Sequence, residues 1–346
     1  MSRSLIGIVS FRLGGPDGVS VVAGHWAEAF RRLGRPVRTV AGAGRADRLV
    51  PGLDMDATPG PDLPSRLGEA LEGTALVVVE NVCSLPRNPA AASALAALLA
   101  GRPAILHHHD LPWQREGLGN LPGWPPNDPA WAHVTINQLS RRELAHRGIA
   151  ATCVYGGFPA PAPGRRALAR DRLGIAPDRW LLLQPTRAIP RTNVPAGLAM
   201  AEALAADYWL TGPAEDGYAP ELERLLATTT ARTHRRVPDG LTMDDAYAAC
   251  DAVLFPSTWE GFGAPLIEAS LHHRPLAVGD YPVAAELAAF GFHWFPADDP
   301  TPLKAFLDHP DPTLLAANHE IARRHFSLEA LTDQLAALLR NHGWWS

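Results

Sequence analysis

The segment that decides the fold is Val253 to Gly279, VLFPSTWEGFGAPLIEASLHHRPLAVG. The apolar run at 252–255 predicts a buried strand, and a glycine-rich turn follows it. Pro265 then begins an apolar segment with helical spacing, and residues 275–278 predict the next strand. A strand, turn, helix and strand in this order are typical of an α/β protein with parallel strands.

The turn in this segment is suited to an anionic ligand. Proline fits a first helical position, and the backbone N–H groups at a helix start attract phosphate. Here those groups belong to Phe262, Gly263 and Ala264. Glu260 and Glu268 lie on either side, eight positions apart. Glycine-rich turns also serve packing alone, so the spacing by itself leaves a structural and a functional interpretation open.

The sequence EGFGAPLIEA within this segment resembles the E-x7-E signature of retaining nucleotide-sugar glycosyltransferases of family 4. The resemblance implies an α/β protein with the GT-B fold, in which two Rossmann-like domains face each other across a cleft. It implies that the final helix crosses back to the N-terminal domain. It also implies a nucleotide-diphosphate sugar as substrate, with no cofactor and no metal ion.

The N-terminal region begins with a strand at 5–10, a glycine-rich loop, a helix at 19–33 and a second strand at 36–40. The loop GGPDG lacks the GxGxxG pattern of dinucleotide-binding proteins, and no acidic residue ends the second strand, which disfavours a nicotinamide cofactor. The loop is similar to the Gly-Gly-Val loop of family 4. That similarity implies that Gly15 and Gly18 lie against the donor diphosphate.

Two further strands are predicted at 75–79 and 103–107, and polar residues follow each of them. Glu80 and Asn81 follow the first strand, and the run 107–110, His-His-His-Asp, ends the second. Three adjacent histidines suggest a metal site, but neighbouring strand residues point to opposite faces and cannot all ligate one ion. His109 and Asp110 resemble the His-Asp pair of family 4, which implies that His109 lines the pocket of the donor sugar and the acceptor.

The segment 111–131 is rich in proline, glycine and tryptophan and is expected to be a long loop. Aromatic rings suit sugar faces and arginine suits anionic groups, so Trp113 and Arg115 are candidates for an acceptor pocket, together with Asn81 and Asp110. The alternative is that the tryptophans only pack the loop down.

A linker with the sequence GGFPAPAPGRR starts at Gly156, and the α/β pattern begins again after it. Strands are expected at 180–184 and 208–212, and helices at 194–206, 220–228 and 243–250. The expected domains are an N-terminal, acceptor-binding domain at 1–158, a donor-binding domain at 159–330, and a C-terminal helix and tail at 331–346 that pack toward the N-terminal domain.

The loop at 186–193 resembles the loop of family 4 that supplies an Arg and, five positions later, a Lys to the donor diphosphate. Arg187 matches the Arg. Thr192 stands in the position of the Lys, and Arg191 is the nearest other cation.

The resemblance assigns a role to each candidate residue. Glu268 would hold the ribose hydroxyls, and Glu260 with the amides of the turn would hold the donor sugar. The residues expected in catalysis are His109, Arg187 and Glu260. Those expected to bind the donor are Gly15, Gly18, Phe262, Gly263, Ala264, Pro265, Leu266 and Glu268. Because no carboxylate is positioned as a nucleophile, the expected reaction is a front-face transfer that retains the anomeric configuration of a hexose.

Two other functions remain open at this point. A sugar-nucleotide epimerase or hydrolase would share the fold and the donor pocket, and would act on the donor without an acceptor. A non-catalytic sugar-nucleotide-binding protein would agree with the threonine at position 192.

The composition disfavours several other classes of protein. The 346 residues are 47% hydrophobic, with a net charge of −5 and no long basic run, which disfavours nucleic-acid binding. Three scattered cysteines favour neither disulfides nor zinc, so a cytoplasmic location is expected. No apolar run is long enough to span a membrane. The arginine-rich segment 141–147 is compatible with peripheral membrane contact, although a solvated helix face explains it as well. The sequence does not indicate the donor base, the sugar, the acceptor or the oligomeric state.

Overall fold

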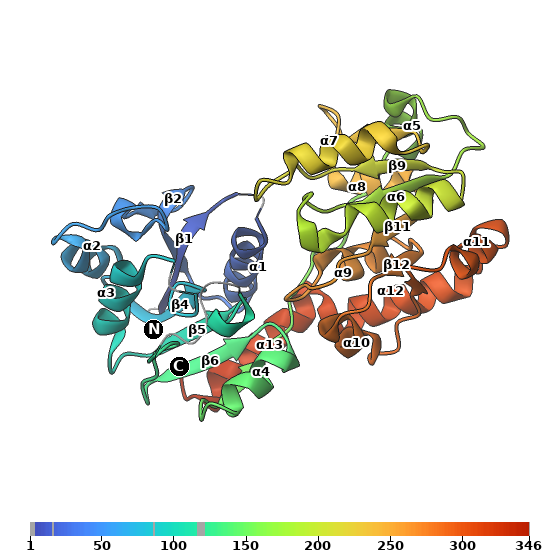
Figure 1. Cartoon of the computed structure of the whole chain (residues 1–346). Helices are drawn as coiled ribbons and strands as arrows, with labels where there is room; N and C mark the ends of the chain where they lie inside the picture. Colours follow the sequence, from blue (N-terminus) through green and yellow to red (C-terminus); the bar gives the residue numbers. More distant parts are fainter. Residues whose placement is uncertain (1–3, 16, 86, 116–121, 346) are drawn as a thin grey trace. The chain divides into compact units, whose positions relative to one another are not determined.

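The computed structural model describes residues 4–15, 17–85, 87–115 and 122–345, and it divides the chain into two compact units (Figure 1). Unit 1 comprises residues 1–159 and 326–346, and unit 2 comprises residues 160–325. Part of the loop expected after Asp110, residues 116–121, lies outside the described residues. No helix in the described part of the chain is both long and apolar enough to cross a membrane.

The sheet of unit 1 has the strand order of a doubly wound α/β fold. Its seven strands, counted over the described residues, run parallel in the order β3-β2-β1-β4-β5-β6-β7. They are β1 (Leu5–Leu13), β2 (Val37–Gly44), β3 (Arg48–Leu49), β4 (Thr74–Glu80), β5 (Ala104–His108), β6 (Trp131–Thr135) and β7 (Ala151–Cys153). The strand order reverses between β1 and β4, where Ile8 lies beside Val78.

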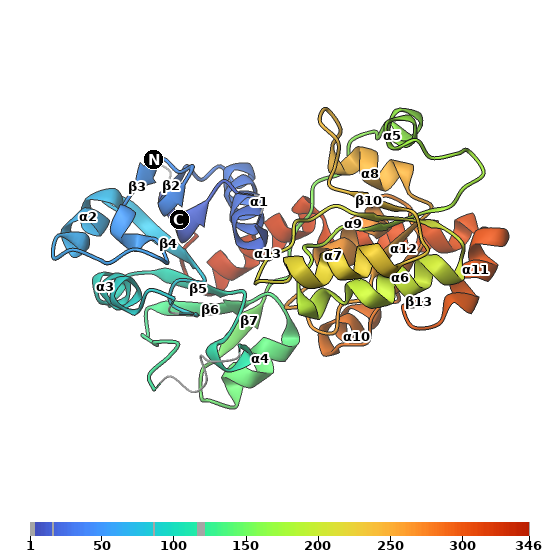
Figure 2. The same cartoon turned by 45° about the horizontal axis from the view of Figure 1, so that its top comes forward.

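Helices cover both faces of this sheet. The helical segments are α1 (Gly18–Arg32), η1 (Pro51–Leu53), α2 (Leu63–Ala70), α3 (Pro89–Leu99), η2 (Pro112–Gln114), α4 (Gln138–Ala145) and α13 (Leu328–Asn341). Alternate residues of a strand point to opposite faces, so Ile8 packs with α1 and α13, whereas Val9 packs with α2 and α3. The last helix of the chain is therefore part of the unit-1 core, where it packs against α1 (Figure 2).

Unit 2 repeats the same strand order. Its strands, as far as the described residues show, run parallel in the order β10-β9-β8-β11-β12-β13. They are β8 (Leu181–Gln184), β9 (Asp207–Leu210), β10 (Thr233–Arg235), β11 (Ala252–Phe255), β12 (Leu276–Val278) and β13 (Phe295–Pro296). The order reverses between β8 and β11. The strand, helix and strand expected within 253–279 are β11, α9 and β12.

The helices of unit 2 also cover both faces of its sheet. They are α5 (Arg166–Leu173), η3 (Pro190–Thr192), α6 (Val194–Ala203), α7 (Ala219–Thr228), α8 (Met243–Ala249), α9 (Ala264–Leu271), α10 (Pro282–Ala288), α11 (Pro300–Asp308) and α12 (Pro312–Phe326). Leu254 packs with α6, α7 and α11 through Leu198, Leu222 and Leu303. Phe255 points to the other face, where its ring lies against Tyr281.

Candidate functional site

The residues expected to bind ligands follow the carboxyl ends of strands at the two positions where the strand order reverses, which is where α/β sheets bind ligands. In unit 2 these strands are β8, followed by Arg187, and β11, followed by Glu260. In unit 1, β1 precedes Gly15 and Gly18 at the reversal, and β5, the strand beside β4, precedes His109. The topology thus groups the candidates of each unit at one edge of its own sheet.

Glu260 connects the two loops of the unit-2 edge. Its Oε1 accepts a hydrogen bond from the Ser257 hydroxyl at 3.1 Å, and its Oε2 lies 3.2 Å from Nη2 of Arg191. The backbone N–H of Thr258 donates to the carbonyl of Arg191 at 2.9 Å. The side chains of Arg191 and Glu260 are 25% and 16% exposed, so the ion pair is partly shielded from water. The turn after β11 therefore holds an arginine from the loop after β8.

Arg187 and Thr192 have different roles in that loop. Arg187 extends outward, half-exposed, with Nη1 2.7 Å from Oε2 of Glu215. Thr192 is buried, and its hydroxyl lies 2.8 and 2.9 Å from the carbonyl oxygens of Arg187 and Ile189. A residue in that position shapes the loop and does not extend into solvent. The guanidinium that is bonded to the turn after β11 is that of Arg191, through Glu260.

The start of α9 requires glycine. Gly263 has φ +91°, and a Cβ there would lie 2.6 Å from the Tyr281 hydroxyl. Phe262 and Ala264, on either side of it, are partly buried. Pro265 and Leu266, by contrast, are buried. This region is a close-packed turn in front of a helix of eight residues.

Glu268 has a partner that the sequence spacing did not indicate. The hydroxyl of Tyr247, on α8, donates to its Oε2 at 2.6 Å. Tyr247 is buried and stacks on His272 with ring centres 4.5 Å apart. Burial raises the pKa of Glu268 above its ordinary value of 4.5, and the hydrogen bond from Tyr247 opposes that rise. The tyrosine lies 21 positions before the glutamate, and only packing of α8 on α9 could reveal the pair.

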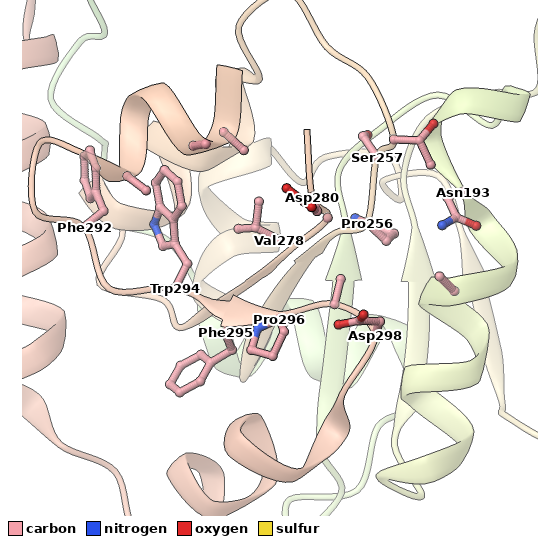
Figure 3. A pocket seen from close by; sticks show the side chains of 17 residues that line it. Asn193, Pro256, Ser257, Val278, Asp280, Phe292, Trp294, Phe295, Pro296 and Asp298 are labelled. Atoms are coloured by element: carbon pink, nitrogen blue, oxygen red, sulfur yellow. The ribbon is translucent and has the colours of Figure 1, made fainter. Parts of the chain in front are cut away.

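A pocket of about 500 Å³ adjoins this edge at the carboxyl ends of β11, β12 and β13 (Figure 3). Its lining includes Ser257, Asp280, Asp298 and the aromatic pair of Phe292 and Trp294. The lining contains Ser257 and Thr258 from the turn but neither Glu260 nor Glu268. The two glutamates therefore do not line this hollow.

The glycine loop of unit 1 leads into a helix that is capped by the chain itself. Asp17, the N-cap of α1, accepts hydrogen bonds from the N–H of Ser20 at 3.0 Å and from its hydroxyl at 2.6 Å. Gly15 lies close to the same carboxylate. A Cβ at Gly18 would meet nothing within 4 Å, so packing within the unit does not require glycine there.

The three adjacent histidines separate onto two faces of β5. His108 lies 2.6 Å from the Ser84 hydroxyl and 2.9 Å from His133. His107 and His109 both point to Glu80, with nitrogens 2.8 and 2.7 Å from its Oε2. Among the described residues, Glu80, His107 and His109 are the group whose ligand atoms lie close enough to hold a metal ion. The distances are those of hydrogen bonds, which account for the arrangement without an ion.

Asn81, Asp110 and Arg115 hold the chain after β5 in place. The side-chain oxygen of Asn81 accepts hydrogen bonds from the backbone N–H groups of His109 and Asp110, each at 3.2 Å. Asp110 in turn pairs with Arg115 at 2.6 Å. These candidates for the acceptor pocket therefore also fix the backbone that carries His109.

Trp113 is held against α4. Its indole N–H donates to Glu143 at 2.8 Å, and the guanidinium of Arg147 lies 3.5 Å from the centre of the ring. One ring face is therefore covered by the protein. This arrangement agrees with the alternative that the tryptophan packs the loop down. Only the opposite face of the indole ring would be available to an acceptor.

Comparison with known proteins places this geometry in context. No family model matches the sequence. Mannosylglucosylglycerate synthase from Thermotoga maritima is 25% identical, with 96% of this chain and 98% of that protein covered. HepE from Anabaena, solved in complex with UDP and glucose, has a TM-score of 0.76 at 18% identity and covers 97% of this chain and 99% of that chain. Sucrose-phosphate synthase from Thermosynechococcus elongatus has a TM-score of 0.75 at 16% identity, over 99% and 100% of the two chains.

The chain has the GT-B fold of glycosyltransferases. The fold expected from the E-x7-E segment is thus confirmed, including the return of the final helix to the N-terminal unit. In this GT-B fold, the two glutamates of unit 2 belong to separate pairs, in which Glu260 is bonded to Arg191 and Glu268 to Tyr247. Arg187 is paired separately, with Glu215. In unit 1, Asn81 bonds to the backbone of His109 and Asp110, and Glu80 bonds to the ring of His109.

Proposed function

We propose that this protein is a glycosyltransferase that moves a hexose from a nucleotide-diphosphate sugar to a hydroxyl of a small molecule or glycan, with retention of configuration and without a metal ion. The main support is the edge of the unit-2 sheet, where two arginines, the start of α9 and two glutamates lie at the reversal of strand order. The similarity to a mannosylglucosylglycerate synthase and to HepE bound to UDP and glucose favours the same class.

Charge on the departing diphosphate is the main obstacle to the transfer. In this proposal Arg187 and Arg191 bind the negatively charged diphosphate. The backbone N–H groups in front of α9 stabilise the same charge, so the site is preorganised for an anion. Arg187 is half-exposed and paired with Glu215, whereas Arg191 is held by Glu260. Binding of the diphosphate would draw both guanidinium groups toward it.

The two glutamates of the signature have separate roles in this proposal. Glu268 accepts hydrogen bonds from the ribose hydroxyls, with the carboxylate held by Tyr247 at 2.6 Å. Glu260, held by Ser257 and Arg191, faces the sugar. In a front-face reaction the acceptor oxygen bonds to the anomeric carbon on the side from which the phosphate departs. The departing phosphate oxygen takes the proton of the acceptor hydroxyl.

Unit 1 contributes the acceptor side in this proposal. His109 and the backbone that follows it, fixed by Asn81, provide polar groups for sugar or acceptor hydroxyls. Asp110 and Arg115 form a pair at the same edge, which suits an acceptor that carries both hydroxyls and an anionic group.

A second candidate is a non-catalytic sugar-nucleotide-binding protein, because the family's Lys position holds a buried threonine. An epimerase or hydrolase would use the same donor pocket. Incubation of the chain with donor alone separates an epimerase or hydrolase from a transferase, since a transferase needs the acceptor to convert the donor. Tight donor binding with no turnover over a broad acceptor panel would instead support the non-catalytic protein.

The decisive experiment combines a donor screen with product analysis. Thermal unfolding is measured with a panel of nucleotide-diphosphate sugars that includes UDP-glucose and GDP-mannose, because a ligand that binds the folded chain raises its apparent stability. The donor that binds is then incubated with an acceptor panel that includes glucosylglycerate, with and without EDTA. We expect a product whose anomeric configuration, read by NMR, equals that of the donor, in equal amounts with and without EDTA.

Glu268→Ala tests the donor site itself. Loss of a charged hydrogen-bond acceptor costs about 1.5–3 kcal/mol, so donor affinity should fall roughly tenfold to a hundredfold. Glu320→Ala is the matched control, since Glu320 is an exposed carboxylate on α12 that pairs with Arg323. Unchanged donor affinity in Glu268→Ala would show that the ribose contact is wrongly assigned.

A further inference from the structure

Glu80 is a fully buried carboxylate with no role in the proposed function so far. It is the last residue of β4, and its side chain is 0% exposed. Its Oε2 accepts a hydrogen bond from Nδ1 of His107 at 2.8 Å and one from Nε2 of His109 at 2.7 Å. The other oxygen, Oε1, is buried with no partner among the described residues. The carboxylate therefore depends on the two histidines for its stabilisation.

The arrangement holds an ionised carboxylate inside the protein. A buried carboxylate is costly unless it is paired. Desolvation alone would raise the pKa of Glu80, but the two histidines lower it to about 2. Glu80 is consequently an anion at neutral pH and can only accept hydrogen bonds. Each ring nitrogen that faces it must carry a proton.

This constraint fixes the ring of His109. Because Nε2 carries the proton toward Glu80, a neutral imidazole has its lone pair on Nδ1. No hydrogen bond of Nδ1 to a described residue is found, and the side chain remains 7% exposed. Asn81 holds the backbone N–H of the same residue at 3.2 Å. Orientation, tautomer and backbone of His109 are thus all set by residues of β4 and the turn after it.

His107 is the second ring that holds the Glu80 carboxylate. Its ring is fully buried and stacks on Trp26 of α1, with ring centres 4.1 Å apart. It also lies 4.5 Å from the ring of His109. His107 therefore prevents the Glu80 carboxylate from turning away from His109.

We propose that Glu80 is the positioning residue of His109, which it holds with Nε2 protonated so that Nδ1 accepts a hydrogen bond from a sugar hydroxyl of the substrate. This inference rests on the proposed function. It adds a buried residue that acts through His109 and has no contact with the substrate itself. It also specifies the chemistry of the contact, because a ring nitrogen with a lone pair selects a hydroxyl donor over a carbonyl or an anionic oxygen.

The first test reads the tautomer directly. In the unliganded protein, long-range proton–nitrogen NMR spectra of the histidine rings should show His109 protonated at Nε2. In Glu80→Gln, which keeps the size but removes the charge, the neutral amide oxygen is a weaker acceptor than the carboxylate for the two ring N–H groups, so the nitrogen shifts of His109 should change. A wild-type His109 protonated at Nδ1 alone would overturn the proposal, and so would a stoichiometric metal ion in the purified protein.

The second test asks whether Glu80 acts through His109. Glu80→Gln should lower kcat/KM for transfer roughly tenfold to a hundredfold. The same change in a His109→Ala background should cause no further loss, because the residue it positions is absent. Additive losses in the double variant would overturn the proposal. Ser84→Ala is the matched control: it removes a buried hydrogen bond to His108, on the opposite face of β5, and should leave kcat/KM unchanged.

These tests also separate the inference from the proposed function. The tautomer of His109 is read without any substrate, so it can fail while the donor screen succeeds. Conversely, a chain that binds no nucleotide sugar would contradict the proposed function and would leave the NMR result on Glu80 and His109 intact.

Discussion

The carboxyl edges of the two sheets have the same strand order but different side chains. The unit-2 edge pairs exposed or half-buried arginines with carboxylates, as in Arg187 with Glu215 and Arg191 with Glu260. The unit-1 edge holds histidines around a buried carboxylate, Glu80. Arginine is always charged and fits phosphate, whereas histidine can remain neutral and meet a hydroxyl.

This difference shows how one scaffold supplies two kinds of site. In both units the topology determines where a ligand edge lies, and the residues placed there determine which ligand it suits. We therefore expect the unit-2 edge to respond to loss of positive charge, and the unit-1 edge to respond to changes in histidine protonation.

The largest expected effect is at Arg187. If it stabilises the charge of the departing diphosphate, Arg187→Ala should lower kcat by roughly a hundredfold to a thousandfold, as loss of a preorganised donor to a developing oxyanion does. Steady-state kinetics measure the change. Arg224→Ala, on the exposed surface of α7 where it pairs with Glu221, serves as the control and should have kcat close to wild type. A kcat near wild type for Arg187→Ala would contradict the idea that positive charge at the unit-2 edge serves the transfer.

The next effect concerns the neutral histidines of unit 1. Burial lowers the pKa of His133 from 6.5 to about 4, so the folded protein resists a proton that the unfolded chain accepts. Stability is therefore lost as pH falls from 6.5 toward 4, on the order of 3 kcal/mol from this group. The free-energy advantage of wild type over His133→Gln, measured by chemical denaturation, should shrink across this range.

The control for that experiment is His309→Gln, because His309 is an exposed residue that follows α11. The free energy of unfolding of this variant should equal that of wild type at every pH. A constant difference between wild type and His133→Gln from pH 7 to pH 4 would mean that the histidine is not kept neutral by burial.

The smallest expected effect distinguishes Arg191 from Thr192. Arg191→Ala should weaken donor binding about tenfold, corresponding to one charged hydrogen bond of about 1.5 kcal/mol, and Arg191→Lys should recover part of it. Thr192→Ala should instead lower the free energy of unfolding by about 1–2 kcal/mol, because its buried hydroxyl holds the loop. Donor titrations and denaturation curves give the two values. Equal loss of affinity in both variants would contradict the separate roles.

Periodicity and turn residues made much of the fold predictable. Apolar runs such as 252–255 mark buried strands, and the proline at 265 marks the start of α9. Several helices were not predicted, among them α2 (Leu63–Ala70) and α5 (Arg166–Leu173). Helix α5 is rich in arginine and follows directly on the Pro/Gly-rich linker. The helical spacing of its apolar residues is therefore weak.

The sequence by itself determined the α/β repeat, the turn with its two glutamates, and the arginine loop, because these depend on residues close together in the chain. Only the tertiary structure decided the partners. Tyr247 reaches Glu268, Arg191 reaches Glu260 across 69 positions, and Glu80 reaches His109 across 29. Such contacts arise from the order of strands in a sheet and the packing of helices on it, which local patterns do not encode.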